Sequence, residues 1–201
     1  MSSSLPPHSA DPQSPPPPSA SPRTRTDPSR RRASAEQDRQ VALDSGVLVV
    51  RLAVGLIMAV HGSQKLFRWF DGSGLDATTA FFTSEGYKAA RAMAWVAALT
   101  ETFCGLGLAI GLLTPLAAAG ILGVMLNAIA VTWDGGFFAP EGIEYQLVLL
   151  SGAVAVALTG PGRLAADQLL PGLRDHRFPR GVAAVALGAI SAVFVLVVLR
   201  D

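Results

Sequence analysis

The sequence predicts an all-α membrane protein, a four-helix transmembrane bundle followed by a fifth, C-terminal transmembrane helix. Half of the 201 residues are hydrophobic and only 15% are charged, whereas about a quarter are charged in soluble domains. The apolar residues also gather in runs of about 20, which as helices cross about 30 Å of hydrocarbon. These runs lack the alternation of barrel strands, and a helix satisfies its own backbone in lipid.

Five apolar runs are the candidate spans, and they cover residues 47–66, 92–113, 115–133, 143–159 and 181–199. The fourth is short and carries Glu144 in its first turn. The second and third runs are so close in sequence that their helices must form a tight hairpin. Small residues four apart, such as Gly55 and Ala59 or Gly105 and Ala109, allow neighbouring helices to approach closely.

Residues 1–44 differ in composition, since they hold nine of the 14 prolines, many serines and six arginines. Such a segment buries too little apolar surface to offset its ordering entropy, so we expect a disordered tail. The arginines at 30–32 suggest twin-arginine export, but a polar segment follows them and the first apolar run is too long for a cleaved signal. We therefore expect a tail (1–44), a four-helix domain (45–170), and a cytoplasmic linker with the fifth helix (171–201).

Lysine and arginine near the span ends indicate the orientation. With the N-terminus inside, six arginines of the tail and four after the fourth run lie on the inner side, and five basic residues lie on the other. We expect a multi-pass protein of the cell inner (cytoplasmic) membrane, with the N-terminus in the cytoplasm and the C-terminus outside. Its expected partner is the lipid bilayer, and no nucleic acid is expected.

Glu101 lies near the middle of the second run, where a carboxylate costs about 2.5 kcal/mol or more. Such a group usually faces a partner or a wet cavity, and often has a function. Either it is protonated, or it pairs with His61 or Lys65, which share one face of the first helix. In both cases a proton can move. Other polar residues of the same outer half of the bundle are Gln64, Asn127 and Glu144.

Each of these residues also has a purely structural interpretation. Lys65 could extend to the membrane interface, Asn127 could join two helices, and His61 could be a neutral packed histidine. Arg51, near the cytoplasmic end of the first run, is expected to extend to that surface, with Asp167 or Asp44 as candidate partners. We expect a structural role for Arg51 and Asp167.

Several chemistries are disfavoured. The single cysteine, Cys104, lies within a span, so the chain alone provides no disulfide, Cys-x-x-Cys pair or four-cysteine iron–sulfur site. The sequence contains no P-loop and no metal site is expected. We expect no covalently bound cofactor.

The order of several short motifs over residues 47–170 resembles the DoxX family of small membrane proteins. These motifs are Arg51-x3-Gly55, His61-Gly62-x2-Lys65-Leu66, Glu101-x3-Gly105-x5-Gly111-Leu-Leu-Thr-Pro and Gly160-Pro-Gly-x4-Asp167. Residues 80–87 are similar to the family's short amphipathic approach to the second span. The resemblance implies a four-helix membrane bundle associated with respiratory or redox complexes. The name-giving members are similar to the small subunit of a thiosulfate:quinone oxidoreductase, whose chemistry would need a partner chain here.

Together these features suggest a membrane subunit of a quinone-linked redox or oxidative-stress complex, with soluble or membrane redox subunits as partners. An apolar pocket in the outer half would take the quinone. Glu101 would exchange protons, with His61 as its partner and as hydrogen-bond donor to a quinone carbonyl. Lys65, Gln64, Asn127 and Glu144 would contact the ligand. Alternatives are a non-catalytic membrane scaffold and a carrier of a small hydrophobic or acidic solute; inverted repeats would favour the carrier, and none is evident.

Overall fold

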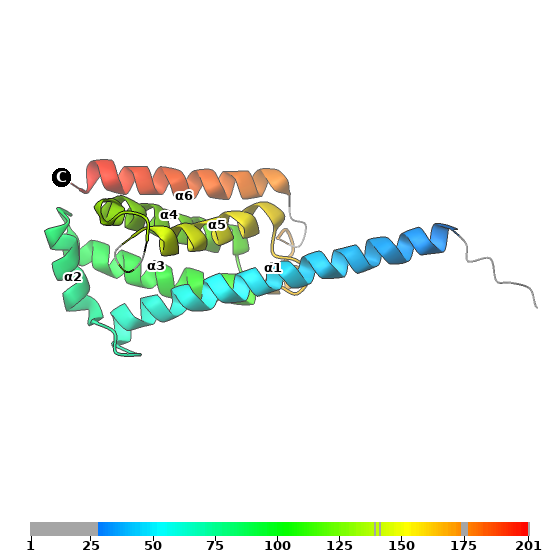
Figure 1. Cartoon of the computed structure of the whole chain (residues 1–201), viewed down its shortest axis with the longest axis horizontal. Coiled ribbons are helices and arrows are strands. Elements are labelled where there is room, and N and C mark those ends of the chain that lie inside the picture. Colours follow the sequence, from blue (N-terminus) through cyan, green and yellow to red (C-terminus); the bar gives the residue numbers. More distant parts are fainter. Residues whose placement is uncertain (1–27, 139, 141, 174–176, 201) are drawn as a thin grey trace, which may run out of the picture. The chain divides into compact units, whose positions relative to one another are not determined.

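The computed structural model describes residues 28–200 except 139, 141 and 174–176, and within that range it is all-α (Figure 1). The α-helices are α1 (Pro28–Phe67), α2 (Gly74–Ser84), α3 (Ala90–Ile110), α4 (Thr114–Thr132), α5 (Glu144–Thr159) and α6 (Phe178–Val198). Two 3₁₀ turns follow α4 and α5, Trp133–Gly135 and Ala166–Leu169. The predicted fold class is confirmed. The bundle described below consists of residues 37–200.

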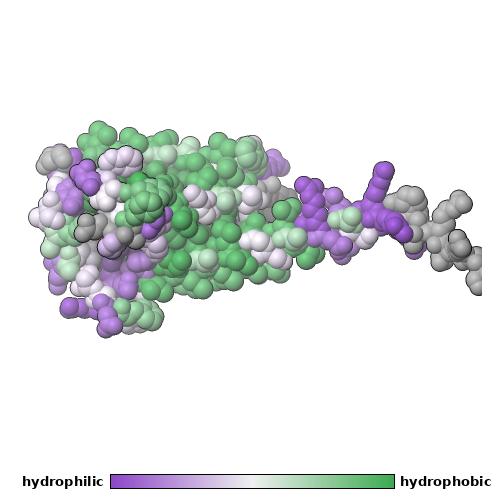
Figure 2. Space-filling model, viewed as in Figure 1, coloured by the Kyte–Doolittle hydropathy of each residue, from purple (hydrophilic) through white to green (hydrophobic). Residues whose placement is uncertain are grey.

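Four of the helices in the described part of the chain, α1, α3, α4 and α6, are long and apolar enough to cross a membrane by length and composition. The fourth predicted run forms α5, whose 16 residues reach about 24 Å, less than the roughly 30 Å of a bilayer core. Figure 2 shows apolar side chains covering the middle of the bundle, as expected for a surface in contact with lipid. Each predicted run thus coincides with one helix.

The first helix starts earlier than the first apolar run. Residues 28–44, which the sequence analysis assigns to a disordered tail, are helical in the structure. Pro28 occupies the first turn, where the missing N–H has no helical acceptor to lose. After it come arginine, alanine, glutamate and glutamine without another proline, and these residues favour helix. The rest of the predicted tail, residues 1–27, lies outside the described residues.

Helices α1 and α3 touch along the small residues that the sequence analysis identifies. A Cβ added at Gly55 would lie 2.6 Å from the Gly105 carbonyl oxygen and 2.6 Å from the Ala109 nitrogen, so only glycine fits there. Gly105 likewise faces the backbone of Ala59. This close approach lets polar side chains on α1 reach α3, which is the basis of the site described below.

The hydrophobic core lies between α1, α3, α4 and α5, around the fully buried Met58, Leu108, Ile121 and Val156. Helix α6 covers α4 and α5 from the other side (Figure 1). Its Gly188 is so close to α4 that an added Cβ would lie 2.6 Å from the Ala119 carbonyl oxygen. Helix α6, the predicted fifth transmembrane helix, is therefore an integral part of the bundle.

The sequence predicts that Arg51 extends to the cytoplasmic surface, but its side chain lies inside the protein, where it binds backbone carbonyls. It is 1% exposed and donates hydrogen bonds to four backbone carbonyls. Two of these carbonyls lie in the last turn of α3 and belong to Leu108 (3.1 Å) and Ala109 (3.1 Å). The other two lie in the segment after α5 and belong to Pro161 and Leu164 (3.0 Å). The last carbonyls of a helix have no partner within it, and irregular backbone at membrane depth must be satisfied by protein. Arg51 provides that partner.

Asp167 has the corresponding role at the start of α4. Its carboxylate is 1% exposed and accepts hydrogen bonds from the backbone N–H groups of Leu113 (2.7 Å) and Thr114 (2.9 Å). Gly111 ends α3 in the left-handed conformation (φ 73°), and the N–H of Leu112 donates to the Gly107 carbonyl at 2.8 Å. The predicted tight hairpin is therefore fixed by a carboxylate from elsewhere in the chain. Asp44, the other candidate partner of Arg51, forms an ion pair with Arg163 (3.6 Å).

Candidate functional site

Glu101 points into the bundle and forms an ion pair with Lys65 of α1. The glutamate is 4% exposed and the lysine side chain 26% exposed. The cause is the close contact of the two helices one turn earlier, where an added Cβ on Gly62 would lie 2.8 Å from the Ala98 carbonyl oxygen. A buried carboxylate is costly unless it is paired and hydrogen-bonded. The sequence left open whether Glu101 is protonated, paired with His61 or paired with Lys65, and in the structure it is paired with Lys65.

This ion pair lies in the wall of a cavity of about 360 Å³. The wall is predominantly apolar and comes mainly from α2, α3, α4 and α6, with Phe81, Phe82, Val96, Val124 and Val131 among its side chains. A volume of about 300–1,000 Å³, apolar walls and a few converging polar groups are typical of small-molecule sites. The polar side chains of the wall are Lys65, Thr78, Tyr87, Thr100, Glu101, Asn127, Thr132 and Ser191.

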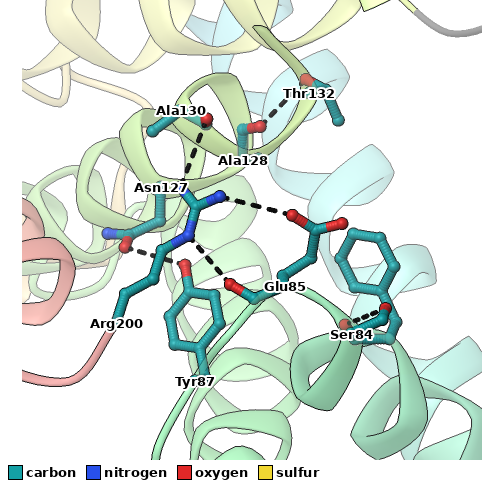
Figure 3. A network of polar contacts seen from close by, with 9 residues as sticks. Ser84, Glu85, Tyr87, Asn127, Ala128, Ala130, Thr132 and Arg200 are labelled. Atoms are coloured by element: carbon teal, nitrogen blue, oxygen red, sulfur yellow. Dashed lines mark hydrogen bonds and ion pairs between the residues drawn. The ribbon is translucent and has the colours of Figure 1, made fainter. Parts of the chain in front are cut away.

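Asn127 and Tyr87 are a second polar element of the cavity (Figure 3). The Tyr87 hydroxyl donates to Asn127 Oδ1 at 3.4 Å, and Asn127 Nδ2 donates to the Gly123 carbonyl at 2.9 Å. Tyr87 lies in the loop between α2 and α3 and is only 5% exposed. Burial raises the pKa of its phenol, with Arg200 acting in the opposite direction and Glu85 adding to the rise. The phenol is therefore neutral and remains a hydrogen-bond donor.

His61, one of the two partners that the sequence allows for Glu101, is hydrogen-bonded to another residue. Its Nε2 lies 2.7 Å from the hydroxyl of Tyr145, in the first turn of α5, and the two rings meet edge to face with centroids 5.6 Å apart. His61 is absent from the cavity wall. His61 and Tyr145 are thus a separate hydrogen-bonded pair beside the ion pair.

Two other predicted ligand-contacting residues also lie outside the described wall of the cavity. The Gln64 amide donates to the Phe70 carbonyl at 3.3 Å and so holds the loop after α1. Glu144 is the first residue of α5, where its backbone N–H donates to the Phe137 carbonyl at 2.9 Å. Of the predicted cluster, the cavity brings together Lys65, Glu101 and Asn127.

Sequence reasoning missed the contribution of α2 and of Tyr87. The helix is only 11 residues long, well short of a membrane span. A signal was present, however, because Thr78, Phe81 and Phe82 lie three and four positions apart, the spacing of one helical face. Tyr87 lies in a loop, where helical periodicity gives no signal, and Ser191 of α6 lies outside the family resemblance.

The side chains of the cavity wall can form hydrogen bonds and exchange protons with a ligand. No group of three His, Cys, Asp or Glu residues in this part of the chain is arranged to hold a metal ion. The ionisable groups around the cavity are Lys65, Glu101 and Tyr87. A neutral ligand could accept a hydrogen bond from the ammonium and donate one to the carboxylate.

Comparison with known proteins shows that most of the cavity wall, except the part from α6, lies in a segment that matches a known family. The sequence model of the DoxX family matches residues 46–134, which include Lys65, Glu101 and Asn127. The uncharacterized membrane protein Rv3486 of Mycobacterium tuberculosis is 33% identical over 136 residues, which are 62% of this chain and 80% of the relative. A Bacillus subtilis protein named "Putative oxidoreductase CatD" is 31% identical over 127 residues, 63% of this chain and 87% of the relative. No solved structure matches the chain.

Proposed function

Because the chain belongs to the DoxX family of membrane proteins, we propose that it is the membrane subunit of a quinone-linked redox or oxidative-stress complex. The quinone would bind in the cavity between α2, α3, α4 and α6. One observation carries the proposal, the Lys65–Glu101 ion pair in the wall of an otherwise apolar cavity. A relative named as an oxidoreductase supports a redox setting.

The cavity suits a flat apolar ring that carries carbonyl groups. Phe81, Phe82 and Val124 would contact the ring, since their side chains form part of the wall. The Lys65 ammonium would donate a hydrogen bond to one carbonyl oxygen, a role that the sequence analysis gave to His61. Asn127, whose Oδ1 already accepts from Tyr87 and whose Nδ2 donates to a carbonyl, would orient the ring.

Reduction of a quinone to a quinol consumes two electrons and two protons. Glu101 would take up a proton on the carboxylate oxygen that its ion pair with Lys65 leaves available, and would then pass that proton to the reduced ligand and be ready to take up the second. His61, one helical turn before Lys65 and bonded to Tyr145, would exchange protons with this pair. The two electrons would come from a soluble or membrane redox partner subunit.

The proposal includes the predicted setting of the protein. The chain would be a multi-pass protein of the cell inner membrane, with the end of the bundle that carries α2 facing outward. The N-terminus would then lie in the cytoplasm, on the side of the Arg51 and Asp167 contacts. Protons would be exchanged with the outer side. Cysteine labelling of intact cells at exposed Ser45 and Asp134, as Ser45→Cys and Asp134→Cys, tests the orientation.

Quinone binding to the purified protein in nanodiscs tests the site. Glu101→Gln and Lys65→Met each break the ion pair, and we expect the Kd of a short-chain quinone to rise about tenfold or more through loss of a charge-assisted hydrogen bond. Glu144→Gln is the matched control, because this glutamate lies outside the cavity wall, and its Kd should equal that of the parent. Unchanged binding in both Glu101→Gln and Lys65→Met would reject the site.

Purification in mild detergent distinguishes the two alternative functions. A redox subunit and bound quinone that copurify with the chain would support the proposal. Partner chains without quinone would favour a scaffold, in which the buried ion pair only joins α1 to α3. Uptake of an acidic or apolar solute into vesicles by the isolated chain would favour a carrier.

A further inference from the structure

Helix α2 covers one side of the cavity as a short separate element. It provides Thr78, Phe81 and Phe82 to the wall and packs mainly against α3. The loop that leads into it holds three non-glycine residues at positive φ, Arg68 (58°), Phe70 (54°) and Asp71 (58°). L-residues rarely adopt this conformation, and clusters of such residues mark strained segments. One end of α2 is thus attached through a strained connection.

The other end of α2 is held by Arg200, which follows α6 (Figure 3). Arg200 Nε donates to the Glu85 carbonyl at 3.0 Å and Nη2 lies 3.4 Å from Glu85 Oε2. Nη1 donates to the Ala130 carbonyl at 3.4 Å. The Lys88 N–H also donates to the Leu199 carbonyl at 2.9 Å. The residues that follow α6 therefore contact both the loop after α2 and the last turn of α4.

Tyr87 transmits this attachment to the cavity. It forms a β-bridge with Arg200, whose guanidinium carbon lies 6.0 Å from the centroid of the tyrosine ring. The Tyr87 side chain also lines the cavity. There its ring meets Phe82 edge to face (centroids 4.7 Å apart) and its hydroxyl donates a hydrogen bond to Asn127. The contacts run from Arg200 through Tyr87 to α2. All of them lie at the end of the bundle that carries α2.

We infer that Arg200 is a positioning residue that holds Tyr87 and α2 closed over the cavity, and that a ligand gains access when the loop 85–89 leaves the end of α6. This gives the fifth predicted span a role in controlling the site. The inference rests on the proposed function in treating the cavity as a ligand site, but it does not depend on the ligand being a quinone. It requires only that access be limited by the contacts of Arg200.

Thiol labelling measures access without any ligand. Thr100 lines the cavity, so Thr100→Cys in a Cys104→Ala background places one thiol there, and N-ethylmaleimide measures its exposure. Adding Arg200→Ala should raise the labelling rate about five- to tenfold, since it removes hydrogen bonds and a partly exposed ion pair. Arg200→Lys keeps the charge without the planar fork and should give an intermediate rate. Arg163→Ala is the matched control and should not change the rate. It removes an arginine that pairs with Asp44 of α1 and is absent from the cavity wall.

General loosening of the bundle is excluded with the native thiol. Cys104 faces α4 near Gly120 and is absent from the described cavity wall. In an otherwise unaltered chain, Arg200→Ala should leave its labelling rate unchanged. If Cys104 accelerates as much as the cavity thiol, or if the cavity thiol labels within twofold of the parent rate, the inference is wrong.

A quinone added to the same labelling reaction separates the two proposals. If quinone protects the cavity thiol but Arg200→Ala does not change the rate, the proposed function stands and the role of Arg200 falls. If Arg200→Ala accelerates labelling but no quinone protects, Arg200 controls access to a cavity for some other ligand.

Discussion

Replacement of Arg51 by methionine should strongly destabilise the bundle. The side chain donates to the carbonyls of Leu108, Ala109, Pro161 and Leu164, and it is 1% exposed. Hydrogen bonds to charged groups contribute about 1.5–3 kcal/mol each, but burial of the guanidinium offsets part of this sum. Each buried carbonyl that loses its donor costs about 1–3 kcal/mol, so the loss of these contacts should cost about 3–5 kcal/mol in total. We therefore expect the free energy of unfolding to fall by about that amount.

Unfolding in detergent micelles by increasing mole fraction of dodecyl sulfate, followed by circular dichroism, measures this change. Arg51→Lys should recover only part of the stability, because an ammonium cannot present the planar fork that reaches both α3 and the segment after α5. The control Arg163→Ala removes an ion pair with Asp44 (3.6 Å) in which the arginine side chain is 69% exposed, so the expected loss is about 1 kcal/mol. A loss below about 1 kcal/mol for Arg51→Met would refute the reasoning, since the carbonyls of Ala109, Pro161 and Leu164 could not then have lost their donor.

Three further changes test other contacts. Gly105→Leu should prevent folding or separate α1 from α3, because a side chain there would meet the backbone of Ala59, and protease resistance in detergent measures this. Asp167→Ala should lower the free energy of unfolding by about 1–3 kcal/mol, because it leaves the buried N–H of Thr114 and the part-buried N–H of Leu113 without their acceptor; Asp167→Asn should lose less stability. In a Tyr145→Phe protein, where Tyr87 is the only tyrosine, ultraviolet titration should show the phenolate forming above the usual pH, because burial raises the pKa of Tyr87. A pKa raised by folding makes stability fall as the pH rises above the unfolded pKa of about 10; a phenolate that forms at the usual pH would contradict this.

The fold could be predicted because its dominant signal is local in the sequence. Each apolar run forms a helix, and the small residues Gly55 and Gly105 do lie where α1 meets α3. The inward position of Glu101 followed from the cost of a carboxylate in lipid. The start of α1 at Pro28 was missed, since serine and arginine content suggested disorder although the segment after Pro28 favours helix.

The partners of the polar residues depend on how the helices rotate and pack, which their spacing along one helix does not determine. His61 and Lys65 share a face of α1, and the sequence could not decide which of them reaches Glu101. The approach of Gly62 to α3 places Lys65 there. Arg51 contacts carbonyls of residues 108–109 and 161–164, and backbone acceptors have no sequence signature. The wall formed by α2 also requires tertiary structure.

Photolabelling tests the central claim most directly, that a quinone occupies the cavity beside Lys65 and Glu101. A quinone with a photoreactive azide on its ring, irradiated with the protein in nanodiscs and followed by peptide mapping, identifies the residues in contact with the ring. The label should fall on cavity residues of α3 and α4, such as Met93 and Val124, and Glu101→Gln should reduce it. A label confined to the exposed groove between α1 and α3, around Trp95 and Phe103, and unaffected by Glu101→Gln would contradict the claim.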